Sequence, residues 1–238
     1  MVVNRVNRKA DISTADMEKI FTCSVFAAFP NDYYALHKVV TRAEPLPADC
    51  DLGRAIEQAE RGHCSLLLMR LNTPGGFLEA TRAATEKMLS SPVPIAAYVS
   101  PGGGRAASAG FFLLQAADIA VMAPGTHTGA AHPVLLAGTP DETLNRKISN
   151  DAAASLRTVT ERRGRNPAVA EKAVLESKSF TDQEALKEKL IDLIAANDQD
   201  LIQQLDGRSL RRFDGRAVTL LLKDAVLTPY DLTTRERL

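Results

Sequence analysis

A strand and the glycine-rich turn that follows it constrain the fold more than any other stretch. Residues 93–99 are mainly apolar or β-branched and lie between Pro92 and Pro101, which predicts a buried strand. Three glycines follow this strand: Gly102, Gly103 and Gly104. Small residues and the apolar stretch 111–117 come next, so the predicted order is strand, turn and helix.

Ser108 is the candidate nucleophile in this region. It stands at the predicted helix start among alanines and glycines, where the first N–H groups of a helix have no intrahelical partner. A hydroxyl beside free amides suits acyl transfer. The turn alone leaves two other interpretations open. Ser108 could be a small residue packed at a helix crossing, or the glycines could hold a phosphate, although the usual phosphate-loop spacing is absent.

A second strand that ends in glycines precedes this one. Residues 65–71 form a continuous apolar run, which predicts a strand buried on both faces, as in parallel sheets. The run leads into Gly75 and Gly76. Because open α/β sheets place their sites at the carboxyl ends of strands, we expect both glycine loops to lie side by side on adjacent parallel strands.

The remaining elements follow from periodicity, capping residues and turn residues. We expect strands over 35–43, 118–122 and 190–195, helices over 51–61, 77–90, 106–117, 142–163, 168–177 and 198–205, a short helix opened by the capping box 181–184, a long loop over 123–141, and a hairpin of 210–213 with 217–222. The helix over 142–163 carries an apolar stripe, with Lys147 on its flank.

Composition narrows the class of protein. The 238 residues suffice for one sizeable α/β domain. Basic and acidic residues total 29 each and tryptophan is absent, so nothing indicates a nucleic-acid or anionic-membrane surface. The three cysteines and four histidines show no disulfide or ligand spacing, so we expect neither a metal nor a cofactor.

The N-terminal residues 1–34 are expected to form a separate extension. Basic residues precede the apolar run 20–29, which could be a degraded secretory leader, and the alternatives are an ordinary extension or a misplaced start site. No stretch reaches the length of a transmembrane helix.

Four motifs in order carry a resemblance to one family. They are Asn-Thr-Pro-Gly-Gly at 72–76, Gly-Arg-Ala-Ala-Ser-Ala-Gly at 104–110, the loop 123–133, and Arg-Lys-Ile-Ser-Asn-Asp-Ala at 146–152. Together they resemble the NfeD-type, Clp-class serine peptidases, membrane-associated partners of stomatin-like proteins. The resemblance implies an α/β fold, a Clp/crotonase-like spiral of ββα units, with the peptidase domain over 35–205. A C-terminal β-hairpin and tail, truncated before membrane segments, would occupy 206–238.

The resemblance also implies roles for individual residues. Ser108 matches the nucleophile and Lys147 the general base of an ATP-independent serine–lysine dyad. Gly76 and Ala109 match the backbone amides of the oxyanion hole. The edges formed by Gly75 and by Gly102, Gly103 and Gly104 would pair with the backbone of an extended substrate.

A lysine can act as a base near neutral pH only in an apolar setting, because an exposed ammonium holds its proton up to about pH 10.4. Leu144 and Ile148 beside Lys147 allow such a setting. Asp151, one turn further, would oppose it if it paired with Lys147. His127 and His132 are interpreted as walls of the site, with a triad role as a minor possibility.

The implied function is a serine endopeptidase that cleaves extended hydrophobic segments of a stomatin-like protein and forms a homo-oligomer. Arg105 would disfavour basic substrate residues if it faced solvent. The alternatives are a catalytically inactive binding module of the same fold and an acyl-CoA hydratase or isomerase, which would need acid/base carboxylates. The sequence departs from the family at Asn72, where aspartate is common, and in lacking the membrane helices that place members at a membrane with an extracytoplasmic catalytic domain.

Overall fold

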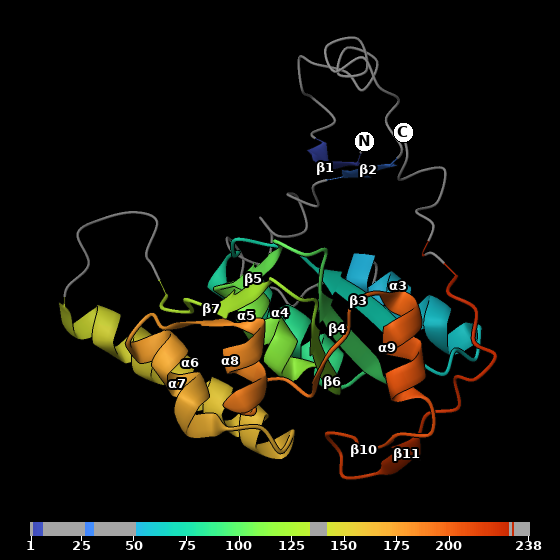
Figure 1. Cartoon of the computed structure of the whole chain (residues 1–238). Helices are drawn as coiled ribbons and strands as arrows, with labels where there is room; N and C mark the ends of the chain where they lie inside the picture. Colours follow the sequence, from blue (N-terminus) through green and yellow to red (C-terminus); the bar gives the residue numbers. More distant parts are fainter. Residues whose placement is uncertain (1, 7–26, 31–50, 134–141, 229, 231–238) are drawn as a thin grey trace.

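A computed structural model describes residues 2–6, 27–30, 51–133, 142–228 and 230. Its core is a parallel sheet in the order β3-β4-β6-β9. The strands are β3 (Leu67–Leu71), β4 (Ile95–Val99), β6 (Ile119–Met122) and β9 (Leu193–Ile194). Figure 1 shows this sheet at the centre of the molecule. The expected strand over 35–43 lies outside the described residues.

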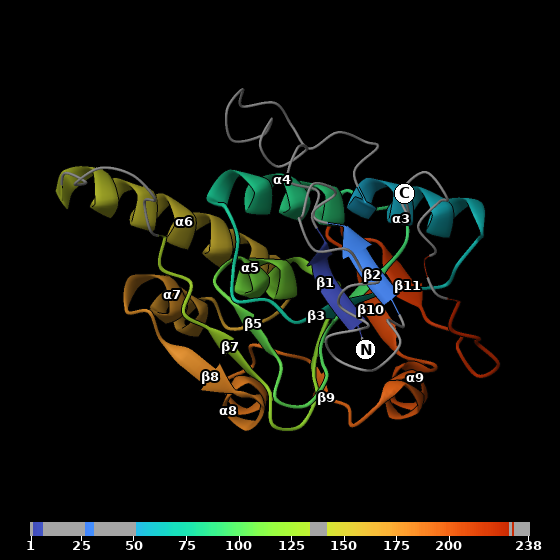
Figure 2. The same ribbon diagram turned by 90° about the horizontal axis from the view of Figure 1, so that it is seen from above.

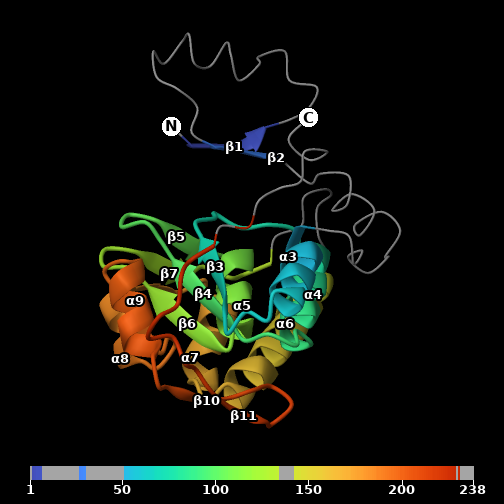
Figure 3. The ribbon, with the colours of Figure 1, turned by 90° about the vertical axis from the view of Figure 1, so that its right-hand side faces the viewer.

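Successive side chains of β4 point to opposite faces of the sheet, and each face has its own hydrophobic core. Ile95, Ala97 and Val99 join the larger core, whereas Ala96 and Tyr98 join the smaller one. The helices over the larger core are α3 (Asp51–Arg61), α4 (Leu78–Leu89), α5 (Ala109–Ala116), α6 (Glu142–Arg162) and α7 (Pro167–Leu175). The other face carries α9 (Asp198–Leu205) and the C-terminal hairpin, as the view in Figure 3 shows.

A second, three-stranded sheet was not expected. It consists of β5 (Arg105–Ala107), β7 (His127–Gly129) and β8 (Ser179–Thr181), in the order β5-β7-β8. The expected helix over 106–117 therefore begins only at Ala109, and the expected loop after 123 contains a strand. Strands of three residues have no readable periodicity, and their pairing joins segments that are far apart in the sequence.

The burial predicted for the strand at 65–71 was wrong for most of its length. In β3 only Leu71 is buried, and Arg70 is exposed and pairs with Asp198 of α9. The reason is position, because β3 is the outer strand of the sheet in the part of the chain that the structure describes. Both faces of β4, which lies inside the sheet, are fully buried as predicted.

Two of the helices begin with caps that were not predicted. Asn166 caps α7, with Pro167 in its first turn, and Asn197 caps α9. Thr181 and Glu184 form the predicted capping box of α8 (Asp182–Lys187). The helix α3 spans the predicted residues 51–61.

The C-terminal hairpin was also predicted correctly. It pairs β10 (Ser209–Arg211) with β11 (Ala217–Thr219) in antiparallel fashion. Near the other end of the chain, β1 (Val2–Val6) and β2 (Ala27–Pro30) pair in parallel, and neither strand was expected.

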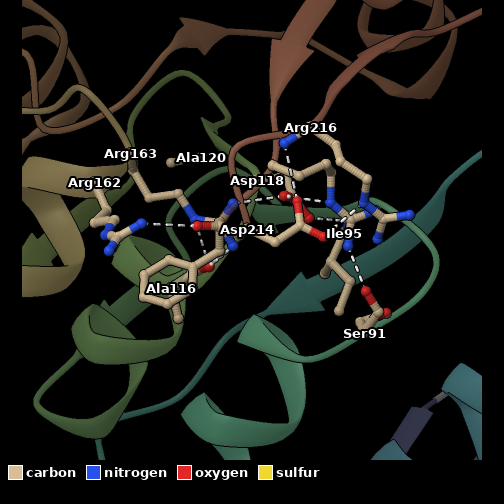
Figure 4. Close-up of polar contacts among 12 residues, drawn as sticks. Ser91, Ile95, Ala116, Asp118, Ala120, Arg162, Arg163, Asp214 and Arg216 are labelled. Atoms are coloured by element: carbon tan, nitrogen blue, oxygen red, sulfur yellow. Dashed lines mark hydrogen bonds and ion pairs between the residues drawn. The ribbon is translucent and has the colours of Figure 1, made fainter.

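A buried ionic cluster fastens the hairpin to the sheet. The Asp118 side chain, fully buried just before β6, accepts a hydrogen bond from the Ile95 N–H and pairs with Arg163 and Arg212 (Figure 4). Arg212, on the hairpin, also donates to the Ser91 carbonyl. Burial lowers the pKa of Arg163, and Asp118 partly offsets that effect. The cluster lies at the amino ends of β4 and β6, whereas the glycine loops follow the carboxyl ends of β3 and β4.

Candidate active site

The two glycine loops lie side by side, as predicted. The strands β3 and β4 that lead into them are adjacent and parallel. Thr73 forms a parallel bridge with Ala106: the Thr73 N–H donates to the Arg105 carbonyl over 2.7 Å, and the Ala107 N–H donates to the Thr73 carbonyl over 3.1 Å. The Asn72 Oδ1 atom accepts the Arg105 N–H over 3.2 Å. Figure 2 shows β5, β7 and the start of α5 close together in the region of the two glycine loops.

Ser108 occupies a strained turn between β5 and α5. As the N-cap of α5 it has φ 53° and ψ −115°, a conformation that a residue with a side chain rarely adopts. Such a backbone stores about 1–3 kcal/mol and persists only where its surroundings enforce it. Here the Ser108 N–H donates to the Gly129 carbonyl over 2.9 Å, and the Phe111 N–H donates to the Ser108 carbonyl over 2.9 Å. A sharp strand-to-helix turn of this kind presents a nucleophilic hydroxyl.

Gly75 makes room for the serine. It has φ +142°, and a Cβ placed on it would lie 2.9 Å from the Ser108 Cβ and 3.3 Å from its Oγ. The neighbouring Gly76 lies less tightly against the start of α5, because its Cβ would lie 3.4 Å from the Ala109 Cβ. The backbone of the first glycine loop therefore runs directly against Ser108 and Ala109.

Two backbone N–H groups beside Ser108 are candidates for binding an oxyanion. Within the described residues, the Gly76 N–H makes no hydrogen bond. Ala109 is the first residue of α5, where an N–H has no intrahelical acceptor. Free amides aimed at a developing negative charge are the main device by which acyl-transfer enzymes stabilise it.

The other predicted substrate-binding glycines lie in the turn before β5. Within that turn, the Gly104 N–H donates to the Pro101 carbonyl over 2.8 Å. The Gly103 N–H donates to the Gly125 carbonyl, in the segment after β6, over 3.1 Å. The Gly104 carbonyl accepts the His127 N–H over 3.3 Å. Gly102 is exposed beside them. Substrate pairing along Gly102 to Gly104 stays a prediction.

Lys147 lies in the second turn of α6, which packs against α5 and α7. It is exposed, as is Leu144, which keeps 48% of its surface open, whereas Ile148 is half-buried. Among the hydrogen bonds of the described residues, none joins the Ser108 Oγ to the Lys147 Nζ. The described part of one chain therefore does not enclose Lys147 in an apolar setting, and the dyad stays a prediction.

Asp151 does not pair with Lys147. It forms an ion pair with Arg82 of α4, the helix that follows the first glycine loop. The carboxylate that could have held Lys147 in its charged form is thus engaged by another cation.

The histidines and Arg105 make no hydrogen bond to Ser108 within the described residues, and the role of the histidines as walls of the site stays a prediction. His127 is exposed on β7, and the His132 Nδ1 lies 2.9 Å from the Val174 carbonyl oxygen. Arg105 is exposed to solvent. The same part of the chain holds no cluster of acidic, cysteine or histidine side chains that could bind a metal.

Sequence reasoning missed the residues that hold the serine in place. Gly129, whose carbonyl receives the Ser108 N–H, has φ +111°, and a Cβ on it would lie 2.4 Å from the Lys178 carbonyl oxygen. Asn72 was noted as a departure from the family, yet its side-chain oxygen joins the two loops. The glycine at 129 can be seen in the sequence, but nothing in the sequence indicates that its strand, β7, pairs with β5.

The fold and the site define a class of protein. It is an α/β protein of the Clp type, with a parallel sheet, a small second sheet, and a serine presented on a strained turn beside free amides. The family model described as the N-terminal domain of NfeD1b matches residues 50–206. The chain belongs to this family.

Known relatives agree with that assignment. The membrane-bound protease PH1510 of Pyrococcus horikoshii is 32% identical over 170 residues, which cover 70% of this chain and 38% of that protein. The membrane protein NfeD1b of Bacillus subtilis is 35% identical over 80 residues, which cover 34% of this chain and 18% of that protein. The matched part of this chain thus spans well under half the length of these relatives.

Solved structures confirm the predicted Clp-like fold. A serine-to-alanine mutant of the 1510-N membrane-bound stomatin-specific protease superposes with a TM-score of 0.69 at 30% identity, covering 75% of this chain and 89% of that one. A lysine-to-alanine mutant of the same protease, in complex with a substrate peptide, gives a TM-score of 0.70 at 23% identity, covering 99% and 94%. In the described part of this chain, no helix is both long and apolar enough to span a membrane.

Proposed function

We propose that this chain is a serine endopeptidase in which Ser108 is the nucleophile and Lys147 the general base. The observation that carries the proposal is the strained Ser108 turn pressed against Gly75, with the free Gly76 amide beside it. The relatives support it, because one is a protease and another is that protease with a serine replaced by alanine.

The chemistry would proceed through an acyl-enzyme. The Ser108 Oγ attacks the scissile carbonyl carbon while its proton passes to the Lys147 amine. The amides of Gly76 and Ala109 bind the resulting oxyanion. The Lys147 ammonium then protonates the leaving amine, and water releases the acyl group from Ser108 by the reverse sequence.

This mechanism needs a neutral amine at Lys147, so the start of α6 must be shielded from water. We propose that a second copy of the chain provides this shielding and covers Leu144, the large apolar residue exposed one turn before Lys147. The expected assembly is a homo-oligomer whose mass, measured by light scattering, falls to that of one chain in Leu144→Asp. A wild-type chain that is monomeric and fully active would contradict this inference.

The substrate we propose is an extended hydrophobic segment of a stomatin-like protein at a membrane. The relatives are membrane-bound, and one is specific for stomatin. The described segments nearest Ser108, 73–77 and 106–110, carry no charged side chain, so they offer amides and apolar contacts only. Backbone pairing would use Gly75 and the exposed edge at Gly102, and the catalytic domain would face the extracytoplasmic side.

Cleavage of peptides tests the proposal. Peptides with valine, leucine or isoleucine around one bond should be cut, lysine-rich peptides should be cut more slowly, and Ser108→Ala should bind the former without cutting. The matched control is Ser155→Ala, an exposed serine of α6 away from the turn. Binding without cleavage by the wild-type chain would instead identify an inactive binding module, and dominant cleavage at charged residues would overturn the substrate class.

A further inference from the structure

Phe77 is an unusual residue for its place in the fold. It is the N-cap of α4, immediately after Gly76, with φ −74° and ψ 141°. N-cap positions favour serine, threonine, aspartate and asparagine, whose side chains accept a hydrogen bond from the first turn. Phenylalanine provides no such bond here, and 39% of its surface stays exposed. The fold therefore gains neither a cap nor full apolar burial from this side chain.

The backbone of Phe77 is nevertheless held firmly. Its carbonyl accepts the Thr81 N–H over 2.9 Å and the Thr81 hydroxyl over 2.8 Å. Gly76, one residue earlier, lies against Ala109. The phenyl ring consequently starts from a fixed point one residue from the amide that would bind the oxyanion.

Partly exposed apolar residues lie along the first half of α5, the helix that packs against α4. The helices α4 and α5 pack together, and their first turns lie at the edge that holds the serine (Figure 2). Ala109 is partly exposed, and Phe112, one turn further along α5, is only half-buried. A substrate carbonyl placed at the Gly76 and Ala109 amides would bring the neighbouring substrate side chain within reach of Phe77.

We propose that Phe77 is a specificity-determining residue that contacts the substrate side chain next to the scissile bond and selects a large apolar one. The proposal rests on the serine peptidase function argued above. A hydrophobic contact of this size changes kcat/KM by about tenfold or more between substrates that fill it and substrates that do not. It requires no role for Phe77 in activating Ser108.

The test compares two variants on two peptides. The peptides differ only in having leucine or serine beside the scissile bond. Phe77→Thr should lower kcat/KM for the leucine peptide about tenfold and leave the serine peptide nearly unchanged, whereas Phe77→Leu should keep most of the preference. Threonine is chosen because it is a good N-cap, so the thermal midpoint should stay equal or rise. Leu221→Ser, at a hairpin residue 77% exposed, is the control and should change neither peptide.

Labelling of Ser108 by a fluorophosphonate distinguishes a failure of the Phe77 proposal from a failure of the serine peptidase function on which it rests. The expected result is equal labelling in wild type and both Phe77 variants, with the leucine preference lost only in Phe77→Thr. An unchanged preference in Phe77→Thr, or a loss of labelling there, would overturn the role of Phe77 while leaving the peptidase function in place. A wild-type chain that neither labels nor cleaves would overturn both.

Discussion

At the scale of single residues, the contact between Gly75 and Ser108 determines whether the nucleophile can take its position. Gly75→Ala should abolish peptide cleavage, because the new Cβ would lie 2.9 Å from the Ser108 Cβ and the backbone has φ +142°. Gly125→Ala is the matched control, with φ +74° but no atom within 4 Å of the new Cβ. In denaturant unfolding, Gly125→Ala should lose about 1 kcal/mol of stability from backbone strain, and Gly75→Ala should lose more because the clash with Ser108 adds to the strain. Wild-type turnover in Gly75→Ala would contradict the packing described.

The sequence allowed part of this site to be predicted. Ser108 was identified because small residues beside one hydroxyl form a local pattern. Gly75 and Gly76 were identified because they follow a predicted strand, and the oxyanion role of Gly76 came from the family resemblance. The positive φ of Ser108 and the anchoring carbonyl of Gly129 were not identified, since they depend on hydrogen bonds between segments about 20 residues apart. Lys147 was chosen through the family resemblance, and its exposure was not expected.

At the scale of elements, the Arg82–Asp151 pair links α4 to α6. Arg82→Met should release Asp151, which lies one helical turn from Lys147 and would favour its charged form. Because both side chains are exposed, the effect on stability should stay below about 1 kcal/mol. We expect kcat/KM at pH 7 to fall about twofold, and Arg82→Met with Asp151→Asn to restore it. A double variant no more active than the single one would refute this role.

The capping box of α8 gives a prediction for pH. Hydrogen bonds from the Thr181 N–H and hydroxyl lower the pKa of Glu184. A lowered pKa means that the carboxylate stabilises the fold above its unfolded-state pKa and that this contribution is lost as the pH falls through the folded-state value. In urea unfolding at several pH values, the deficit of Glu184→Ala relative to wild type should be largest near pH 7 and shrink towards pH 3. A deficit independent of pH would contradict this account.

Elements with local signals were the easiest to predict. The capping box at Thr181 and Glu184 and the hairpin turn at 214–215 depend on residues that are close together in the sequence. By contrast, the sequence predicts a helix from residue 106, because alanine favours a helix, and only pairing with Thr73 and β7 makes Arg105–Ala107 a strand.

At the scale of the whole molecule, Asp118 connects three parts of the chain that are distant in sequence. Asp118→Asn should lower the free energy of unfolding by about 3–5 kcal/mol, because it leaves the buried guanidinium groups of Arg163 and Arg212 without their carboxylate. The comparison is Asp214→Asn, an exposed partner of Arg216, which should cost much less because water screens this pair. Equal losses measured by denaturant unfolding would rule out the cluster as the fastening of the hairpin.

The overall architecture could be predicted because two units of apolar strand, glycine loop and helix recur in order, and parallel strands in such units are connected by helices that pack on the sheet. The outer position of β3 and the small second sheet could not, since strand order depends on contacts that no single segment encodes. The Asp118 cluster was missed for the same reason: its members are separated by more than 40 residues.

The central claim is that Ser108 is a nucleophile activated by Lys147, and covalent labelling tests it most directly. The chain is treated with a fluorophosphonate, digested, and the modified residue located by mass spectrometry, with the labelling rate compared between wild type and Lys147→Ala. The account predicts an adduct on Ser108 and a rate lowered about 100-fold or more in Lys147→Ala, the usual effect of losing a general base. No adduct on Ser108, or equal rates in the two proteins, would contradict it.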